Sequence, residues 1–173
     1  VFGLMDVRET NVCAESKIWS LAGVDPMLAL CIEPAYVAFH AVRESHVRFG
    51  SSVAVIGLGA LGLLTIRMAR LSGAERLFAV DPLPARRAWA TKNGADAVFD
   101  PAEGDIALQI HDWTEKAGVD VAIELSGAYA GLATAIRSVR VGGTVCSAGF
   151  YQREAHGMWL GREWHHNRLT LVV

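Results

Sequence analysis

A glycine-rich turn between an apolar run and a helical pattern is the feature that most constrains the fold. Residues 52–56 read Ser-Val-Ala-Val-Ile, a short β-branched run that is typical of a strand buried on both faces of a parallel sheet. Residues 57–62 follow with the spacing G-x-G-x-x-G and lead into an apolar helical pattern that stops at Ser72 and Gly73. A strand, a tight turn and a helix in this order predict the start of a βαβ unit.

The same alternation of strand and helix continues to the end of the chain. Further strands are predicted at 77–80, 97–99, 119–125, 144–148 and 169–173, and helices at 34–47, 60–71, 85–93, 105–117 and 131–139. Strands that alternate with helices of this length imply a parallel sheet covered on both faces, with right-handed crossovers. We therefore expect an α/β fold, a doubly wound parallel sheet of the Rossmann type with three layers, about six strands and the strand order 3-2-1-4-5-6.

The first 32 residues do not follow this alternation. They carry short apolar pieces and a turn-like segment at 23–26, so we expect a strand and a connecting loop before the main domain. Pro34 suits the first turn of the helix that opens that domain. The chain starts at Val1 without a signal pattern and ends in an apolar run, so we expect a fragment of a longer protein.

Composition and charge limit the possible partners. The 16 Lys and Arg residues against 18 Asp and Glu residues give a net charge of −2, so we expect no nucleic-acid partner. The longest uncharged stretch, residues 49–66, contains four Gly and two Ser and predicts a buried strand and helix rather than a membrane span. The three cysteines lack C-x-x-C spacing, which favours a reducing, cytoplasmic setting.

Each glycine of the turn has a physical task. Gly57 permits the tight turn, Gly59 lets the backbone approach a pyrophosphate, and Gly62 lets the helix pack closely on the strand. The helix that starts at Ala60 offers unpaired N–H groups and a partial positive charge to phosphates. The turn therefore predicts a dinucleotide-binding site.

Asp81 makes the cofactor expectation more specific. It stands nineteen residues after Gly62, at the end of the second predicted strand. A carboxylate there accepts hydrogen bonds from the adenosine ribose hydroxyls and repels a 2′-phosphate, so we expect NAD rather than NADP. Two facts qualify this expectation: Asp81-Pro82 is also ordinary turn chemistry, and Arg86 or Arg87 could accommodate a phosphate.

Further segments complete a family resemblance. Glu33-Pro34, the turn at 57–62, Asp81, Glu-Leu-Ser-Gly at 124–127 and Val-Gly-Gly-Thr-Val at 141–145 occur in this order and at this spacing. The chain thereby resembles the cofactor domain of the zinc-type alcohol dehydrogenases, in the medium-chain dehydrogenase/reductase superfamily. The resemblance implies that residues 33–173 form an NAD-binding Rossmann domain and that residues 1–32 are the tail of a catalytic domain and a linker.

The resemblance also implies roles for individual residues, and it assigns no catalytic residue within this chain. Glu33 matches the position of a zinc ligand, although a Glu at a helix start is equally ordinary N-terminal chemistry. The residues expected to contact the cofactor are Val37, Gly57, Gly59, Ala60, Leu61, Gly62, Asp81, Arg86, Ser126, Gly127, Gly149 and Phe150.

The implied function is hydride transfer between a small-molecule alcohol or carbonyl substrate and the nicotinamide of NAD. In the family a zinc ion acts as a Lewis acid on the substrate oxygen, and we expect zinc in the full-length enzyme while this fragment alone is inactive. The resemblance further implies a homodimer or higher oligomer, joined through a short strand at residues 157–160 that pairs across a two-fold axis.

Three other functions remain open at this point. A zinc-free quinone or enoyl reductase of the same superfamily shares the domain but usually prefers NADPH. A non-catalytic dinucleotide-sensing module would share the fold and the site without a zinc ligand at Glu33. A methyltransferase that uses S-adenosylmethionine also has a glycine-rich first turn and an acid after its second strand.

Overall fold

A six-stranded parallel sheet forms the centre of the molecule. The computed structural model describes residues 2–3, 9–155 and 158–173. The sheet strands are β3 (Ser52–Ile56), β4 (Arg76–Val80), β5 (Ala97–Phe99), β6 (Val119–Glu124), β7 (Val139–Ser147) and β8 (Thr170–Val172). Their spatial order is β5-β4-β3-β6-β7-β8 and all neighbours are parallel, which confirms the predicted order 3-2-1-4-5-6.

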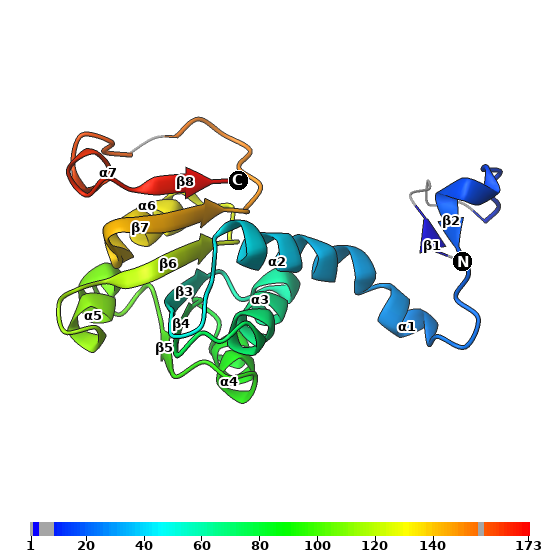
Figure 1. Ribbon diagram of the computed structural model, residues 1–173, viewed down its shortest axis with the longest axis horizontal. Helices are drawn as coiled ribbons and strands as arrows, with labels where there is room; N and C mark the ends of the chain where they lie inside the picture. Colours follow the sequence, from blue (N-terminus) through cyan, green and yellow to red (C-terminus); the bar gives the residue numbers. More distant parts are fainter. Residues whose placement is uncertain (1, 4–8, 156–157) are drawn as a thin grey trace.

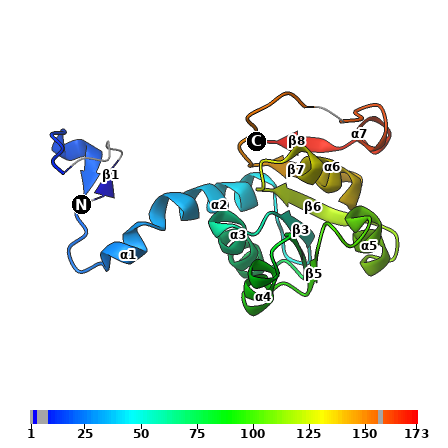
Figure 2. The same cartoon turned by 180° about the vertical axis from the view of Figure 1, so that it is seen from behind.

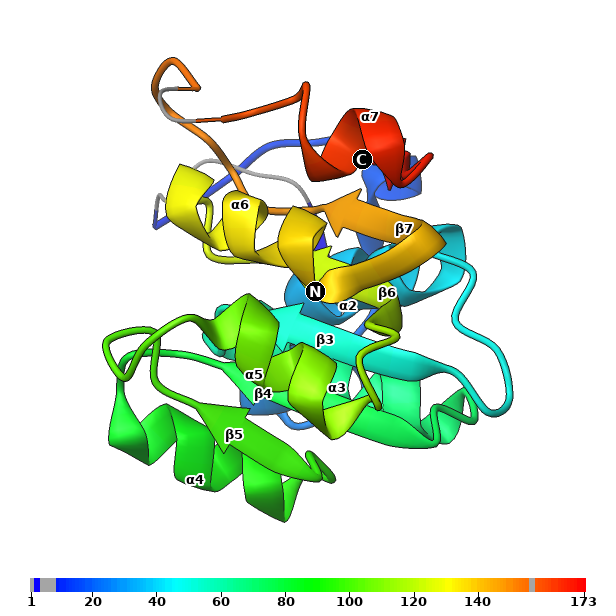
Figure 3. The ribbon, with the colours of Figure 1, turned by 90° about the vertical axis from the view of Figure 1, so that its left-hand side faces the viewer.

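Helices cover both faces of the sheet, so the predicted three-layer, doubly wound α/β fold is confirmed (Figure 1). The main helices are α2 (Ile32–Glu44), α3 (Ala60–Leu71), α4 (Pro84–Lys92), α5 (Ile106–Trp113) and α6 (Tyr129–Ser138). α2, α3 and α4 pack on one face, whereas α5 and α6 lie side by side on the other (Figure 3). A short helix α7 (Glu163–His166) precedes β8.

The strand sequences explain the two layers of helices. Side chains alternate between the faces of a strand, so Val53 and Val55 join the apolar cluster under α2, α3 and α4. Ala54 and Ile56 join the cluster under α5 and α6. Because both faces are covered, β3 reads as a continuous apolar run, as the sequence pattern of residues 52–56 predicts.

Several element boundaries differ from the predicted ones. α2, for example, spans Ile32–Glu44 rather than 34–47. α5 ends at Trp113 rather than near residue 117, because Glu115 and Lys116 adopt positive φ angles of 55° and 70°. α6 begins two residues earlier than predicted, at Tyr129. β7 begins at Val139 rather than 144, and the glycines expected to end the helix lie inside this strand, where its pairing with β6 shifts register.

The N-terminal segment lies beyond the far end of α2, away from the sheet (Figures 1 and 2). It contains β1 (Phe2–Gly3) paired antiparallel with β2 (Ile18–Trp19), a 3-10 turn at Glu15–Lys17, and the short helix α1 (Pro26–Ala29). The sequence analysis predicted one strand and a loop here, so the second short strand and α1 correct it. The division between residues 1–32 and 33–173 stays a prediction.

A polar cluster holds the start of β6 at the edge of the sheet opposite to the glycine turn. The Asp120 carboxylate accepts hydrogen bonds from the Ser52 backbone N–H and hydroxyl, both at 2.8 Å, and from the Arg140 guanidinium at 2.7 Å. Burial raises the pKa of Asp120, but the donors of Arg140 and Ser52 outweigh it and leave the pKa below its usual range. This carboxylate therefore ties β6, β3 and β7 together at their amino ends.

No helix within the described residues is both long enough and apolar enough to cross a membrane.

Candidate functional site

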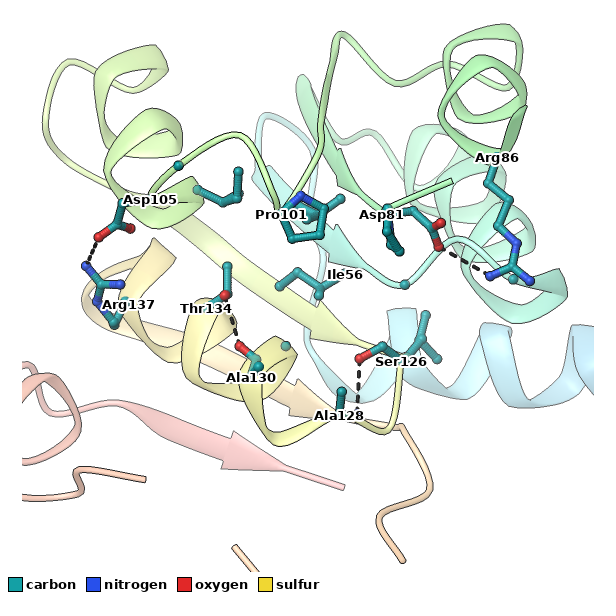
Figure 4. Close-up of a pocket in the computed structure, with 18 residues that line it drawn as sticks. Ile56, Asp81, Arg86, Pro101, Asp105, Ser126, Ala128, Ala130, Thr134 and Arg137 are labelled. Atoms are coloured by element: carbon teal, nitrogen blue, oxygen red, sulfur yellow. Dashed lines mark hydrogen bonds and ion pairs between the residues drawn. The ribbon is translucent and has the colours of Figure 1, made fainter. Parts of the chain in front are cut away.

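A cavity of about 800 Å³ opens at the carboxyl ends of the strands (Figure 4). Its walls come from the segments that follow β3, β4, β5 and β6. β3 pairs with β4 on one side and with β6 on the other, so the chain reverses its winding direction at this point. Ligands of open α/β sheets bind in the crevice at such a switch point. Of the predicted residues, the cavity is lined by Gly57, Gly59, Asp81, Arg86 and Ser126.

The glycine turn packs closely where the fold requires it and leaves space where a ligand could approach. Gly57 has a φ of +90°, and a Cβ there would lie 2.6 Å from the Ser126 backbone nitrogen. A Cβ on Gly62, in the first turn of α3, would lie 1.9 Å from the Gly57 carbonyl oxygen. A Cβ on Gly59 would meet nothing within 4 Å. Gly57 and Gly62 are therefore required by packing, whereas Gly59 borders open space.

Asp81 is buried and hydrogen-bonded within the protein, which the sequence did not indicate. It lies directly after β4, its exposed fraction is 3%, and its Oδ2 accepts a hydrogen bond of 2.8 Å from the Leu58 N–H. Oδ1 accepts from the Leu83 N–H at 2.9 Å, and the Arg86 guanidinium lies 3.5 Å from Oδ2. This carboxylate therefore already fixes the glycine turn to the end of β4, and its role toward the ribose hydroxyls stays a prediction.

The two arginines after Asp81 differ in their freedom to reach a ligand. Arg87 donates to the Asp81 carbonyl at 2.7 Å and to the Asp100 carboxylate at 2.9 Å, and its side chain is only 17% exposed. Arg86 is 48% exposed and lines the cavity, where Figure 4 shows it reaching toward Asp81. Between these two, Arg86 is the residue that can bind an anion or a ribose.

A second, smaller cavity of about 350 Å³ brings together Val37, Gly149 and Phe150. Val37 lies on α2, while Gly149 and Phe150 follow β7. Gly127 connects the two regions, because it has a φ of +67° and a Cβ there would lie 2.6 Å from the Phe150 carbonyl oxygen. Ala60 and Leu61 stand in the first turn of α3. The predicted cofactor residues thus lie along one edge of the sheet.

Glu124 is a buried residue of this edge to which the sequence analysis gave no role. It ends β6 with an exposed fraction of 0%. Its Oε1 accepts hydrogen bonds from the Ser126 N–H, at 2.7 Å, and from the Ser126 hydroxyl. Its Oε2 accepts from the Gly127 N–H, at 3.3 Å, and from the Tyr151 hydroxyl. In the sequence, Glu124 is recognisable only as an acidic residue between an apolar strand and Ser126-Gly127. Its hydrogen-bond partners depend on the tertiary structure.

A metal site is not assembled by the described residues. Among them, no three His, Cys, Asp or Glu side chains are grouped so that they could hold a metal ion. Glu33 is exposed in the first turn of α2. Zinc in proteins needs at least three protein ligands, so Glu33 could supply at most one and we derive no chemical step through zinc.

Comparison with known proteins gives consistent matches. The profile of the zinc-binding dehydrogenase family matches residues 60–171. D-guloside 3-dehydrogenase of Escherichia coli K12 is 40% identical over 144 residues, which is 83% of this chain and 41% of that protein. L-threonine 3-dehydrogenase of Pyrococcus horikoshii is 36% identical over the same shares of the two chains. The chain thus spans about two fifths, 41%, of the length of these relatives.

Solved structures agree with the sequence matches. A zinc-binding dehydrogenase of Sinorhizobium meliloti 1021, solved bound to NADP, is 31% identical, with a TM-score of 0.80 over 86% of this chain and 44% of that one. The 2R,3R-butanediol dehydrogenase of Bacillus subtilis is also 31% identical, with a TM-score of 0.75 over 83% of this chain and 40% of that one.

The glycine contacts lead to a prediction about stability. We expect Gly62→Ala to lower the free energy of unfolding by about 1–3 kcal/mol, because the new methyl group forces α3 away from the Gly57 carbonyl. Gly59→Ala, the matched control, should unfold at the wild-type urea concentration because its Cβ enters open space. Urea denaturation followed by circular dichroism measures both. Equal midpoints for the two variants would contradict the packing argument.

Proposed function

The chain belongs to the zinc-binding dehydrogenases, and on this premise we propose that residues 33–173 are the NAD-binding domain of an alcohol dehydrogenase. Residues 1–32 would be the tail of its catalytic domain and the linker. Family membership confirms the resemblance inferred from the sequence and removes the methyltransferase alternative. The proposed reaction is hydride transfer between a small-molecule alcohol or carbonyl substrate and nicotinamide, in a cytoplasmic enzyme.

The single observation that carries this proposal is the cavity at the switch point, which is lined by Gly57 and Gly59 of the glycine turn and by Asp81. The first turn of α3 presents backbone N–H groups there and begins with no acidic side chain, which suits a pyrophosphate. Asp81 and Arg86 stand where the adenosine ribose would lie. These residues fit a dinucleotide in both size and charge.

The chain's own contribution would be to bind and orient. When bound, the nicotinamide accepts or donates the hydride. Val37, Gly149 and Phe150 would border the nicotinamide end, and Leu61 would lie behind the ring. Ser126 and Gly127 would border the cofactor between the two cavities. If the full-length enzyme holds zinc, Glu33 is the candidate ligand from this chain, and the remaining ligands must come from the part that its relatives carry in addition.

Asp81 supports a preference for NAD over NADP. A buried carboxylate repels a 2′-phosphate, and we expect the wild-type chain to favour NAD by about 1–3 kcal/mol. The Sinorhizobium meliloti relative was solved with NADP, so the outcome is not fixed by family. Isothermal titration calorimetry with both cofactors measures the preference.

Two variants distinguish recognition of the ribose by Asp81 from a general effect of removing one negative charge. Asp81→Ser should lose the preference, whereas Asp100→Ser removes a carboxylate that is bound to Arg87 and should keep it. NADP binding as tight as NAD binding by the wild type would refute the preference and would identify Arg86 as a phosphate ligand.

We also expect binding without turnover in this chain. A catalytic zinc needs three protein ligands and an open position, and the described residues assemble no such group. The test adds NAD, zinc and a panel of simple alcohols to the purified chain and follows NADH absorbance. Formation of NADH would contradict this expectation.

The proposal includes a homodimer or higher oligomer. The predicted pairing segment is 157–160. Gly157 lies outside the described residues, and the residues from Met158 to Leu160 are not paired as a strand within this single chain, so their pairing across a two-fold axis stays a proposal. Trp159 is 66% exposed, and β8 is the edge strand of the sheet. An exposed edge with apolar side chains invites pairing.

Light scattering at several concentrations tests this assembly. Trp159→Lys should shift the chain toward the monomer, because it places a charge in the proposed contact. Trp89→Lys is the control, since Trp89 on α4 is also exposed, at 56%. Each of the two rings has a cation over it, Lys92 over Trp89 and Arg162 over Trp159. A wild-type chain that stays monomeric at all concentrations would contradict the proposal.

A further inference from the structure

Residues of three loops meet around the buried carboxylate of Glu124. These loops follow β3, β6 and β7, and they include the proposed cofactor residues Gly57, Ser126, Gly127 and Gly149. A Cβ on Gly149 would lie 2.5 Å from the Glu124 Oε2. Glu124 is thus in contact with the loops that follow β6 and β7, and the loop that follows β3 packs on Ser126.

These loops pack so closely that no side-chain atom fits between them at Gly57 or Gly149. A Cβ on Gly57 would lie 2.6 Å from the Ser126 nitrogen, and a Cβ on Gly149 would lie 2.5 Å from the Gly127 nitrogen. The same two nitrogens donate to the two oxygens of Glu124. The hydrogen bonds of one side chain therefore fix the backbone against which both neighbouring loops pack.

The chemistry of the cluster requires a carboxylate. Two backbone N–H groups and two hydroxyls surround the two oxygens, and all four donate. A buried carboxylate is costly unless it is hydrogen-bonded in this way. Burial, together with the hydrogen bond to Glu124, raises the pKa of Tyr151 well above its usual range, so this phenol keeps its proton.

We propose that Glu124 is a positioning residue for the nicotinamide end of the cofactor, because it sets the distance between the loops at 126–127 and 149–150. This inference rests on the function proposed above. Glu124 itself is fully buried and cannot touch a ligand, so it acts through Ser126, Gly127 and Gly149. The adenosine end, at Asp81 and Arg86, has no hydrogen bond to Glu124 among the described contacts.

A purely structural role makes a different prediction, and Asp120 provides the comparison. Asp120 lies on the same strand at its opposite end, and its carboxylate also accepts hydrogen bonds from a backbone N–H, a hydroxyl and a third donor. Loss of either carboxylate should lower the melting temperature. Only a change at Glu124 should lower the affinity for NAD while the affinity for its adenosine half stays unchanged.

The experiment compares Glu124→Gln with Asp120→Asn in the 173-residue chain. Glutamine has the same shape, but its NH2 group must face the N–H of either Ser126 or Gly127, and a backbone N–H cannot reverse its polarity. We expect NAD affinity to fall about tenfold in Glu124→Gln. AMP, which represents the adenosine half alone, should bind within about twofold of wild type. Asp120→Asn should leave both affinities near wild type.

Tyr151→Phe keeps the proposal testable if Glu124→Gln does not fold. It removes one donor to Oε2 and should weaken NAD binding by a few fold, while AMP binding is unchanged. Equal NAD affinity in wild type and in every folded variant at Glu124 and Tyr151 overturns the positioning role but leaves the proposed function intact. Parallel losses for NAD and AMP overturn it in favour of a structural role. A wild-type chain that binds neither ligand overturns the proposed function and this inference together.

Discussion

The tight packing of the first turn of α3 against the end of β3 determines how the rest of the binding edge is built. A methyl group on Gly62 would lie 1.9 Å from the Gly57 carbonyl oxygen, so the helix can only start this near the strand with glycine at that position. Because α3 begins so close to the sheet, its N-terminal end follows directly on Gly57 and Gly59, which line the crevice.

Local sequence signals were sufficient for most strands of the sheet, but not for the start of β7 or for every helix end. β3 and β5 have their predicted bounds, at 52–56 and 97–99, because β-branched and apolar runs end at clear turn residues. α5 ends early because a Gly118 N–H donates to the Thr114 hydroxyl at 3.0 Å, across two residues with positive φ. Neither Glu115 nor Lys116 belongs to a residue type that predicts this conformation.

In the candidate site, too, the features that depend on local sequence could be predicted, whereas those that depend on tertiary contacts could not. The spacing of the glycines and the position of Asp81 after β4 were readable, since both depend on the order of strand, turn and helix. The burial of Asp81, the different partners of Arg86 and Arg87, and the donors around Glu124 were not readable. Each of these depends on which loops meet at the switch point, and several of those contacts join residues more than twenty positions apart.

The hydrogen bond from the Leu58 N–H to Asp81 also limits how this protein can evolve. The side chain that would discriminate between two forms of the cofactor is the one that anchors the glycine turn. Under the proposed preference for NAD, a substitution that removes this acceptor would change selectivity and loosen the turn at the same time. A lineage that exchanges one cofactor for the other would need a second, compensating change, such as a new acceptor for that N–H, before the first could be tolerated.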